Sequence, residues 1–528
     1  MHRVPRSALH ALLLGLTLWC SACAEWDPPR DSEAAPPRPN IVFIFTDDHA
    51  TQALGCYGST LPSVTPRLDA LAREGAVFEN CFCGNAICGP SRASVLTGLH
   101  SHANGFTQNG ARFNVDLATF PKELQAAGYS TALFGKWHLD SVPQGFDCWE
   151  ILPDQGEYYD PTFITAQGRE RREGYVTDLI TERALRWMRE ERDPSKPFLL
   201  CIWHKAPHRE WLPAPRHFAL LEDAVLQPPP TLFDNHIGRP GAAVQEMTIA
   251  RHLMPDSDLK LPPGTQDGLA KPQAWATNHA RARLSNMRAA FKEPWQAHYD
   301  PRNAAFAAHP PTGKELVVWK WREYIKDYLR CVKAVDEGVG AVLDTLEGEG
   351  LGSACVIYSS DQGFFLGEHG FYDKRWMYEE ALRMPLIVRW PGQVAANRRV
   401  PELCQNTDFA PTLLDIAGVR SGMRAHGRSL LPLVRGQDTP PRRAIYYRYY
   451  EHPGTHNVAR HMGVRTERFK LLFFEEDGHK ELFDLAADPQ ELCNLALDPR
   501  QAALVKQLSE LLRAEAAAVG DVMPTNFY

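Results

Sequence analysis

The chain has 528 residues, of which 44% are hydrophobic and 23% charged, a composition typical of globular proteins with a sizeable core. Its length favours more than one domain. The 57 basic and 64 acidic residues give a net charge of -7, which argues against nucleic acid as the main partner.

The first residues have the pattern of an export signal. Two arginines precede an apolar run over residues 8–19, which is too short to span a bilayer. Two cleavage sites fit the small residues that follow: residues 22–24 resemble a signal-peptidase site, and residues 21–23 resemble a bacterial lipobox with a lipid anchor on Cys23. We predict a signal peptide over 1–24, a Pro-rich linker over 25–38, and a periplasmic or cell-surface protein that is either soluble or lipid-anchored.

Four apolar runs, each followed by polar residues, predict the fold. They cover residues 41–45, 130–134, 198–203 and 354–358, and helical patterns lie between them over residues 66–74, 120–127, 177–192 and 324–347. Continuous apolar runs of this length predict buried parallel strands, so the alternation predicts an α/β sandwich with a large, mainly parallel sheet. Ligands bind such sheets beyond the carboxyl ends of the strands, where the four polar segments would meet.

Two of these polar segments offer oxygen ligands for a metal ion. Asp47 and Asp48 follow the first run, and Asp361 and Gln362 follow the fourth. Each pair also fits a plainer role, as a helix cap or as turn residues. Together they supply three carboxylates and an amide oxygen, which suit calcium or magnesium and argue against zinc or copper. We expect one Ca²⁺, because many protein oxygens would build the site.

A second set of residues carries charge and proton-transfer chemistry. Cys88 opens the run Cys-Gly-Pro-Ser-Arg, whose proline suits the first turn of a helix. Arg92 lies one turn further on, so both side chains would face one pocket, and the helix N-terminus would add positive potential for an anion. Each of the other candidates alone fits a solvated charge or a packed histidine; they are Lys136, His138, His208 and Lys374.

These segments resemble the motifs of type I sulfatases. The matching blocks include Cys-Gly-Pro-Ser-Arg at 88–92, Gly-Lys-Trp-His at 135–138, Ala-Pro-His at 206–208, Ser-Asp-Gln-Gly at 360–363 and Asp-Lys-Arg-Trp at 373–376. The resemblance covers roughly residues 39–495. It implies an alkaline-phosphatase-like sandwich with a smaller α+β C-terminal domain, and hydrolysis of sulfate esters. It also implies that a separate maturation enzyme oxidises Cys88 to formylglycine.

The resemblance assigns a role to each site residue. A hydroxyl of the formylglycine hydrate attacks sulfur, and His208 and Lys374 hold the bridging oxygen and protonate the leaving alcohol. His138 then takes the proton of the second hydroxyl, which expels sulfate and restores the aldehyde. Lys136 and Arg92 hold the hydrate and the sulfate oxygens. The metal ligands implied are Asp47, Asp48, Asp361, Gln362 and the modified Cys88.

The substrate and the domain boundaries are less closely defined. Residues 361–391 resemble exported bacterial N-acetylglucosamine-6-sulfatases and mucin-desulfating enzymes, so we expect 6-O-sulfated N-acetylglucosamine in glycosaminoglycan or mucin glycans as substrate. Candidate substrate contacts are His369, His456 and His461. We predict a catalytic domain over 39–429 and a C-terminal subdomain over 430–528. Residues 224–313 form either an insertion that shapes the cleft or a surface loop.

Two other functions fit the same residues. One is a phosphate or phosphonate monoester hydrolase of the same superfamily, with the same hydrate as nucleophile. The other is a catalytically inactive, exported glycan-binding protein. The complete set of acidic and basic site residues argues against such loss of activity.

Overall fold

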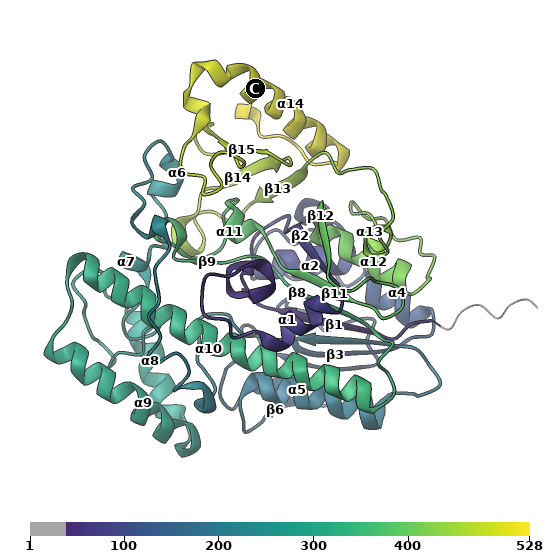
Figure 1. The fold of residues 1–528 in the computed structure, drawn as a ribbon, viewed down its shortest axis with the longest axis horizontal. Coiled ribbons are helices and arrows are strands. Elements are labelled where there is room, and N and C mark those ends of the chain that lie inside the picture. The colour runs from purple at the N-terminus through teal and green to yellow at the C-terminus, as the bar shows by residue number, and fades with distance from the viewer. Residues whose placement is uncertain (1–37, 528) are drawn as a thin grey trace, which may run out of the picture. The chain divides into compact units, whose positions relative to one another are not determined.

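A ten-stranded sheet forms the centre of the computed structural model, which describes residues 38–527 (Figure 1). Its strands run in the order β12-β2-β11-β8-β1-β7-β3-β4-β5-β6. Their bounds are β1 (Ile41–Thr46), β2 (Ala76–Phe82), β3 (Ser130–Lys136), β4 (Cys148–Leu152), β5 (Thr162–Thr165), β6 (Gly168–Arg171), β7 (Phe198–Trp203), β8 (Cys355–Ser360), β11 (Leu386–Arg389) and β12 (Arg398–Gln405).

The four strands predicted from apolar runs are neighbours at the centre of this sheet. β8, β1, β7 and β3 pair in parallel, with Ile41 aligned with Leu199 on one side and with Cys355 on the other. Every residue of β1, β7 and β8 is buried, which explains why these strands have no alternating polar positions. The prediction of a mainly parallel sheet is confirmed. Antiparallel pairing is limited to β11 and to the β4-β5-β6 edge.

Helices cover both faces of the sheet. One group, α1 (Pro66–Arg73), α5 (Val176–Arg186) and α10 (Gly313–Gly348), packs together, and a second group contains α2 (Cys88–Thr97), α4 (Phe120–Ala126) and α12 (Phe409–Ile416). The predicted helix at 324–347 is the C-terminal part of α10, which begins eleven residues earlier. The remaining short segments are α3 (Ser101–Asn104), α6 (Pro240–Ala243), α7 (Ile249–His252), α11 (Glu379–Leu382), α13 (Leu431–Val434), β9 (Phe365–Leu366) and β10 (Tyr372–Asp373).

Residues 224–313 contain two longer helices, α8 (Ala274–Asn286) and α9 (Ala289–Ala308). α9 contains Pro294 and Pro301, which argue against a helix when the sequence is considered alone. Tertiary packing compensates, because the ring of Phe306 in α9 packs against Trp319 of α10 with centroids 4.6 Å apart. Residues 274–308 are therefore mostly helical, whereas residues 224–273 contain only short helical segments.

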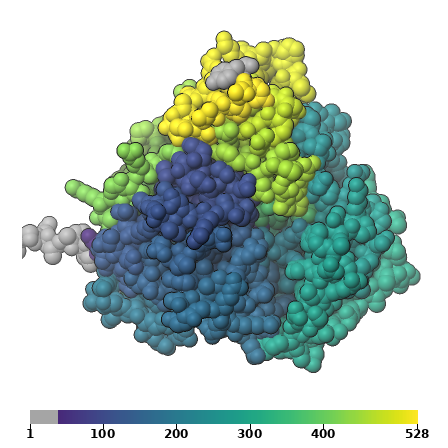
Figure 2. Space-filling view, turned by 180° about the vertical axis from the view of Figure 1, so that it is seen from behind, coloured from purple at the N-terminus to yellow at the C-terminus, as the bar shows by residue number. Residues whose placement is uncertain are grey.

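A four-stranded antiparallel sheet and helix α14 (Ala502–Ala518) form the C-terminal part. The strands are β13 (Ile445–Tyr449), β14 (His461–Arg465), β15 (Phe469–Phe474) and β16 (Lys480–Asp484). One face of this small sheet packs on α14 around Met462 and Leu512. The chain after α14 lies on the segment that follows α2, where a ring nitrogen of His102 is 2.9 Å from the carbonyl oxygen of Val519 (Figure 2). The boundary at residue 430 stays a prediction, since the residues from Pro39 onward form one compact unit.

The predicted signal peptide, the lipid-anchor cysteine Cys23 and the linker up to residue 37 lie outside the described residues. Within residues 38–527, no helix combines the length and the apolar character that crossing a membrane requires.

Gly135 shows how the fold sets the position of a candidate site residue, because it directly precedes Lys136 at the end of β3. Its φ is +116°, and a Cβ there would lie 1.9 Å from the carbonyl oxygen of Trp203 in β7. We expect Gly135→Ala to lower the free energy of unfolding by about 3 kcal/mol or more, measured by denaturant titration. Gly168→Ala is the matched control, with φ of +129° and no atom within 4 Å. Equal losses in both variants would assign the effect to φ alone.

Candidate active site

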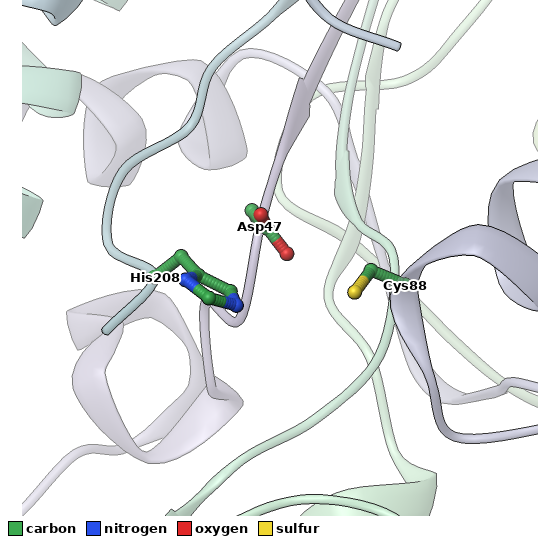
Figure 3. Close-up of side chains that lie close together, drawn as sticks. All are labelled: Asp47, Cys88 and His208. Carbon is green, nitrogen blue, oxygen red and sulfur yellow. The ribbon is translucent and has the colours of Figure 1, made fainter. Parts of the chain in front are cut away.

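The predicted site residues meet at the carboxyl edge of the four central strands. Asp47 follows β1, Lys136 ends β3, His208 follows β7 and Asp361 follows β8. Cys88 comes from the start of α2 and completes the group. Figure 3 shows the Cys88 thiol and the His208 imidazole directed toward one another, with Asp47 beside them. The parallel order of the strands therefore gathers residues that are far apart in the chain.

Three buried carboxylates form the centre of the site. Asp47, Asp48 and Asp361 are each 0% exposed, and their nearest oxygens lie within 4.8 Å of one another. The backbone N–H of Asp48 donates to Asp361 Oδ1 at 3.1 Å. Burial raises the pKa of Asp48 to about 7, and burial together with the charge of Asp47 raises the pKa of Asp361. Such a cluster is stable as anions only beside positive charge.

Two oxygens of this cluster have no hydrogen-bond partner among the described residues. Asp47 Oδ1 and Gln362 Oε1 are both buried, although the amide nitrogen of Gln362 donates to Asp48 Oδ1 at 2.5 Å. Buried oxygens without donors are rare in folded proteins and are well suited to a cation. Carboxylate and amide oxygens are the ligands that Ca²⁺ and Mg²⁺ prefer. The four predicted oxygen ligands therefore lie together and fit a divalent ion of this kind.

Three buried cations surround the carboxylates. Lys136 forms an ion pair with Asp47, and Lys374 Nζ donates to Asp48 Oδ2 at 2.7 Å. Arg92 is 0% exposed and donates to Asp361 Oδ2 from Nε at 3.1 Å and from Nη2 at 3.0 Å. Each carboxylate thus has at least one cationic partner, and any additional positive charge would attract an anion into the site.

Cys88 lies in the positive field of these cations. It is 1% exposed, and Asn109 Nδ2 lies 3.6 Å from its Sγ. Burial alone would raise the pKa of the thiol, but the charges of Lys136, His138 and Lys374 outweigh it and hold the pKa well below its usual value. The same field would hold the anionic group of an ester at this position.

Two histidines lie at the edge of the group in different environments. His138 Nε2 is 3.4 Å from Asp154 Oδ1, and the charge of Cys88 raises the His138 pKa against the opposing effect of burial. Nδ1 of His208 lies 2.7 Å from the carbonyl oxygen of Arg209, so Nε2 is the ring atom that faces the site. Burial, followed by the charge of Lys136, lowers the pKa of His208 to about 3.

The sequence did not single out four further residues of the site. Gln155 Oε1 accepts a hydrogen bond from Lys136 Nζ at 2.5 Å, and Asn109 contacts Cys88. Both lie in segments without a recognisable motif. Asp373 and Arg375 form an ion pair with one another on either side of Lys374. Their position next to Lys374 in the Asp-Lys-Arg block could have indicated that they belong to the site.

The three candidate substrate histidines have different surroundings. His369 is 1% exposed and its Nδ1 lies 2.8 Å from Asp234 Oδ2, while His461 is 0% exposed and packs against Trp376. Both are interior residues with packing partners. His456 Nε2 lies 3.2 Å from Asp373 Oδ2, next to Lys374, and only this histidine remains a proposed substrate contact.

A cavity of about 700 Å³ opens beside His208. Its walls come from the segment after β4, the segment after β7 and helix α8. Residues of the 224–313 region therefore form one wall of the space next to the site.

Buried cations around an acidic cluster at the edge of a parallel sheet form a site that suits an anionic ester, and comparison with known proteins identifies the family. The chain belongs to the sulfatase family, whose model matches residues 39–419, and is a sulfuric ester hydrolase. A second model, N-sulphoglucosamine sulphohydrolase, C-terminal, matches residues 367–518.

Relatives and solved structures agree with this assignment. An N-acetylglucosamine-6-O-sulfatase of Bacteroides thetaiotaomicron is 45% identical over 519 residues, with 96% of this chain and 91% of the relative covered. The human N-acetylglucosamine-6-sulfatase is 25% identical, with coverages of 88% and 82%. The solved structure of BT4656 in complex with its substrate D-glucosamine-2-N,6-O-disulfate has a TM-score of 0.87 and 44% identity, covering 92% of this chain and 99% of that one. The predicted alkaline-phosphatase-like sandwich with a smaller C-terminal α+β part is confirmed.

Proposed function

We propose that this sulfatase removes the 6-O-sulfate of N-acetylglucosamine in glycosaminoglycan or mucin glycans. The 45% identity to a relative named N-acetylglucosamine-6-O-sulfatase, extending over 96% of this chain, carries the proposal. The substrate of the structurally similar BT4656 also carries a sulfate on O6 of a glucosamine. Asp47, Cys88, Lys136, His208 and their neighbours provide an anion site of the corresponding chemistry.

The proposal includes two groups that this chain would hold. Asp47, Asp48, Asp361, Gln362 and modified Cys88 would hold one Ca²⁺, which would supply positive charge to the sulfate oxygens. Formylglycine made from Cys88 would supply the nucleophile toward sulfur as its hydrate. We infer that a maturation enzyme makes this change and that the protein is exported, either soluble or lipid-anchored.

The buried cations would bind and orient the sulfate group. Lys136, Lys374 and Arg92 are fixed by the carboxylates, so their positions need little rearrangement when the ester enters. Such preorganised charge stabilises the negative charge that spreads over oxygens in the transition state of sulfuryl transfer.

The two histidines would move protons at opposite stages. Nε2 of His208, together with Lys374, would hold the bridging oxygen and donate a proton to the leaving alcohol. Because the bound ester is negatively charged, it would favour protonated His208 and oppose the effect of burial on its pKa. His138 would hold the proton released on the Cys88 side, where Asp154 and Gln155 orient its ring.

The test is an assay of matured protein, with conversion of Cys88 verified by peptide mass. The substrates are N-acetylglucosamine 6-sulfate, galactose 6-sulfate and N-acetylglucosamine 6-phosphate. We expect kcat/KM for the first to exceed the other two by about 100-fold, because the site would pair with hydroxyl and amide groups of one sugar. Faster phosphate hydrolysis would identify a phosphate monoester hydrolase instead. Binding without turnover of any ester would identify a glycan-binding protein.

A further inference from the structure

The floor of the cavity beside His208 contains a lysine that the proposed chemistry does not use. Lys205 follows β7, three residues before His208, and is 3% exposed. Its Nζ lies 4.8 Å from the centroid of the Tyr158 ring, and Lys205 and Tyr158 both line the cavity. Among the described residues, no carboxylate forms an ion pair with it.

The other cations of this wall are balanced or open to water. Arg209 donates to both carboxylate oxygens of Asp258 at 2.6 Å, and Arg283 Nη1 donates to Glu210 Oε2 at 2.5 Å. His279 also pairs with Glu210, and Arg171 is exposed. Lys205 is therefore the buried cation of this wall without a matching acid in the part of the chain that the structure describes.

A buried ammonium group without an acid partner is unfavourable unless something else supplies negative charge. Burial, followed by the positive charge of Lys136, lowers the pKa of Lys205 to about 8, although the more distant carboxylates of Asp47, Glu210 and Asp48 act in the opposite direction. At neutral pH most of this group still carries its charge, and a nearby anion would stabilise the charged form. A bound anion would therefore lower the free-energy cost of burying this charge.

The remaining lining of the cavity suits a saccharide. Trp275 of α8 is 52% exposed at the wall, and the rings of Tyr158 and Tyr159 also line the space. Aromatic rings with polar edges offer flat apolar surfaces beside hydrogen-bonding groups, as sugar rings do. The volume of about 700 Å³ leaves room for groups beyond a single sulfate ester.

We propose that Lys205 binds an anionic group, a sulfate or a carboxylate, that the substrate carries in addition to its 6-O-sulfate. The inference rests on the proposed function, because that function places the sugar next to His208. Two sources supply this chemistry: an N-sulfate on the same glucosamine, and the carboxylate of an adjacent uronic acid. Lys205 is then a specificity residue for the charge pattern of the glycan.

The test compares Lys205→Met, which keeps the length of the side chain, with Lys205→Arg, which keeps the charge. N-sulfoglucosamine 6-sulfate and N-acetylglucosamine 6-sulfate are assayed in parallel, as are disaccharides in which a uronic acid or a neutral hexose follows the 6-sulfated N-acetylglucosamine. For Lys205→Met we expect KM to rise about tenfold for at least one substrate with the second anion. KM for the matching neutral substrate should be nearly unchanged, as should kcat for all four. Lys205→Arg should keep the lower KM for the substrate with the second anion.

Lys196→Met is the matched control, because Lys196 is exposed and lies outside the cavity. Of the two substrate pairs, the one whose charged member shows the higher KM with Lys205→Met identifies the source of the anion. The proposal would be overturned if Lys205→Met changed KM equally for charged and neutral substrates, or changed KM for none of them.

A binding measurement separates this proposal from the proposed function. Calorimetry with the wild-type protein requires no turnover and uses two ligand pairs: glucosamine N-sulfate with N-acetylglucosamine, and a uronic acid disaccharide with the matching neutral hexose disaccharide. Tighter binding of an anionic ligand than of its neutral counterpart, lost in Lys205→Met, supports the site even if no 6-sulfate is hydrolysed. Equal affinities in the wild-type protein would overturn the site, even if Lys205→Met does not fold and whatever the enzyme hydrolyses.

Discussion

Replacing Cys88 by alanine should lower kcat/KM of the matured enzyme for a sulfate ester by roughly four orders of magnitude or more. The variant removes the side chain that would be converted to the proposed nucleophile, while the buried cations and carboxylates stay in place. Substrate binding should persist, so the loss should appear in kcat rather than in KM. Initial rates with N-acetylglucosamine 6-sulfate, measured at the same protein concentration, test this expectation.

Two controls separate chemistry from folding in this experiment. Cys493→Ala changes an exposed cysteine that has no contact with the site residues and should keep full activity. Wild-type protein whose Cys88 remains a thiol, verified by peptide mass, should be as inactive as Cys88→Ala. Residual activity within tenfold of the matured wild type, with an unchanged melting temperature, would place the nucleophile on another residue.

Removing the divalent ion should abolish activity and lower the melting temperature by about 5 °C. Three buried carboxylates and two buried oxygens without hydrogen-bond donors lie together, and an ion that binds only the folded state stabilises it. The measurements are the rate and the melting temperature after exhaustive chelation and after return of Ca²⁺. Mg²⁺ should restore both less well, because it demands stricter octahedral geometry.

Asp361→Asn is the matching variant, since it preserves shape but removes one negative charge from the cluster. Its melting temperature should respond weakly to Ca²⁺. Full activity in chelated protein shown to be free of metal would contradict the proposed metal site. It would mean that Lys136, Lys374 and Arg92 alone balance the carboxylates.

The central sheet and its catalytic edge could be predicted because strong local signals coincide there. The run at 198–203 is wholly apolar and flanks β1, so its strand and its parallel pairing follow from burial on both faces. The proximity of Asp48 and Asp361 follows from the rule that ligands gather at the carboxyl ends of parallel strands. Applying that rule requires only the order of strands and turns along the sequence.

The parts that could not be predicted depend on contacts between distant segments. The prolines of α9 oppose a helix locally, and packing against α10 compensates for them. Gln155 approaches Lys136 through the fold, without a local pattern. His369 and His461 illustrate the converse problem. The sequence alone does not distinguish a histidine that packs among aromatic rings from one that binds a ligand.

The hydrogen bond from Asp48 to Asp361 spans 313 positions of the chain and therefore links the site to the order of folding. Contacts of such long sequence separation close slowly, because the chain must lose the freedom of the whole intervening loop. During synthesis, the acidic pair at 47–48 emerges long before its partner at 361. Recovery of turnover during refolding therefore requires that β1 and β8 have already paired.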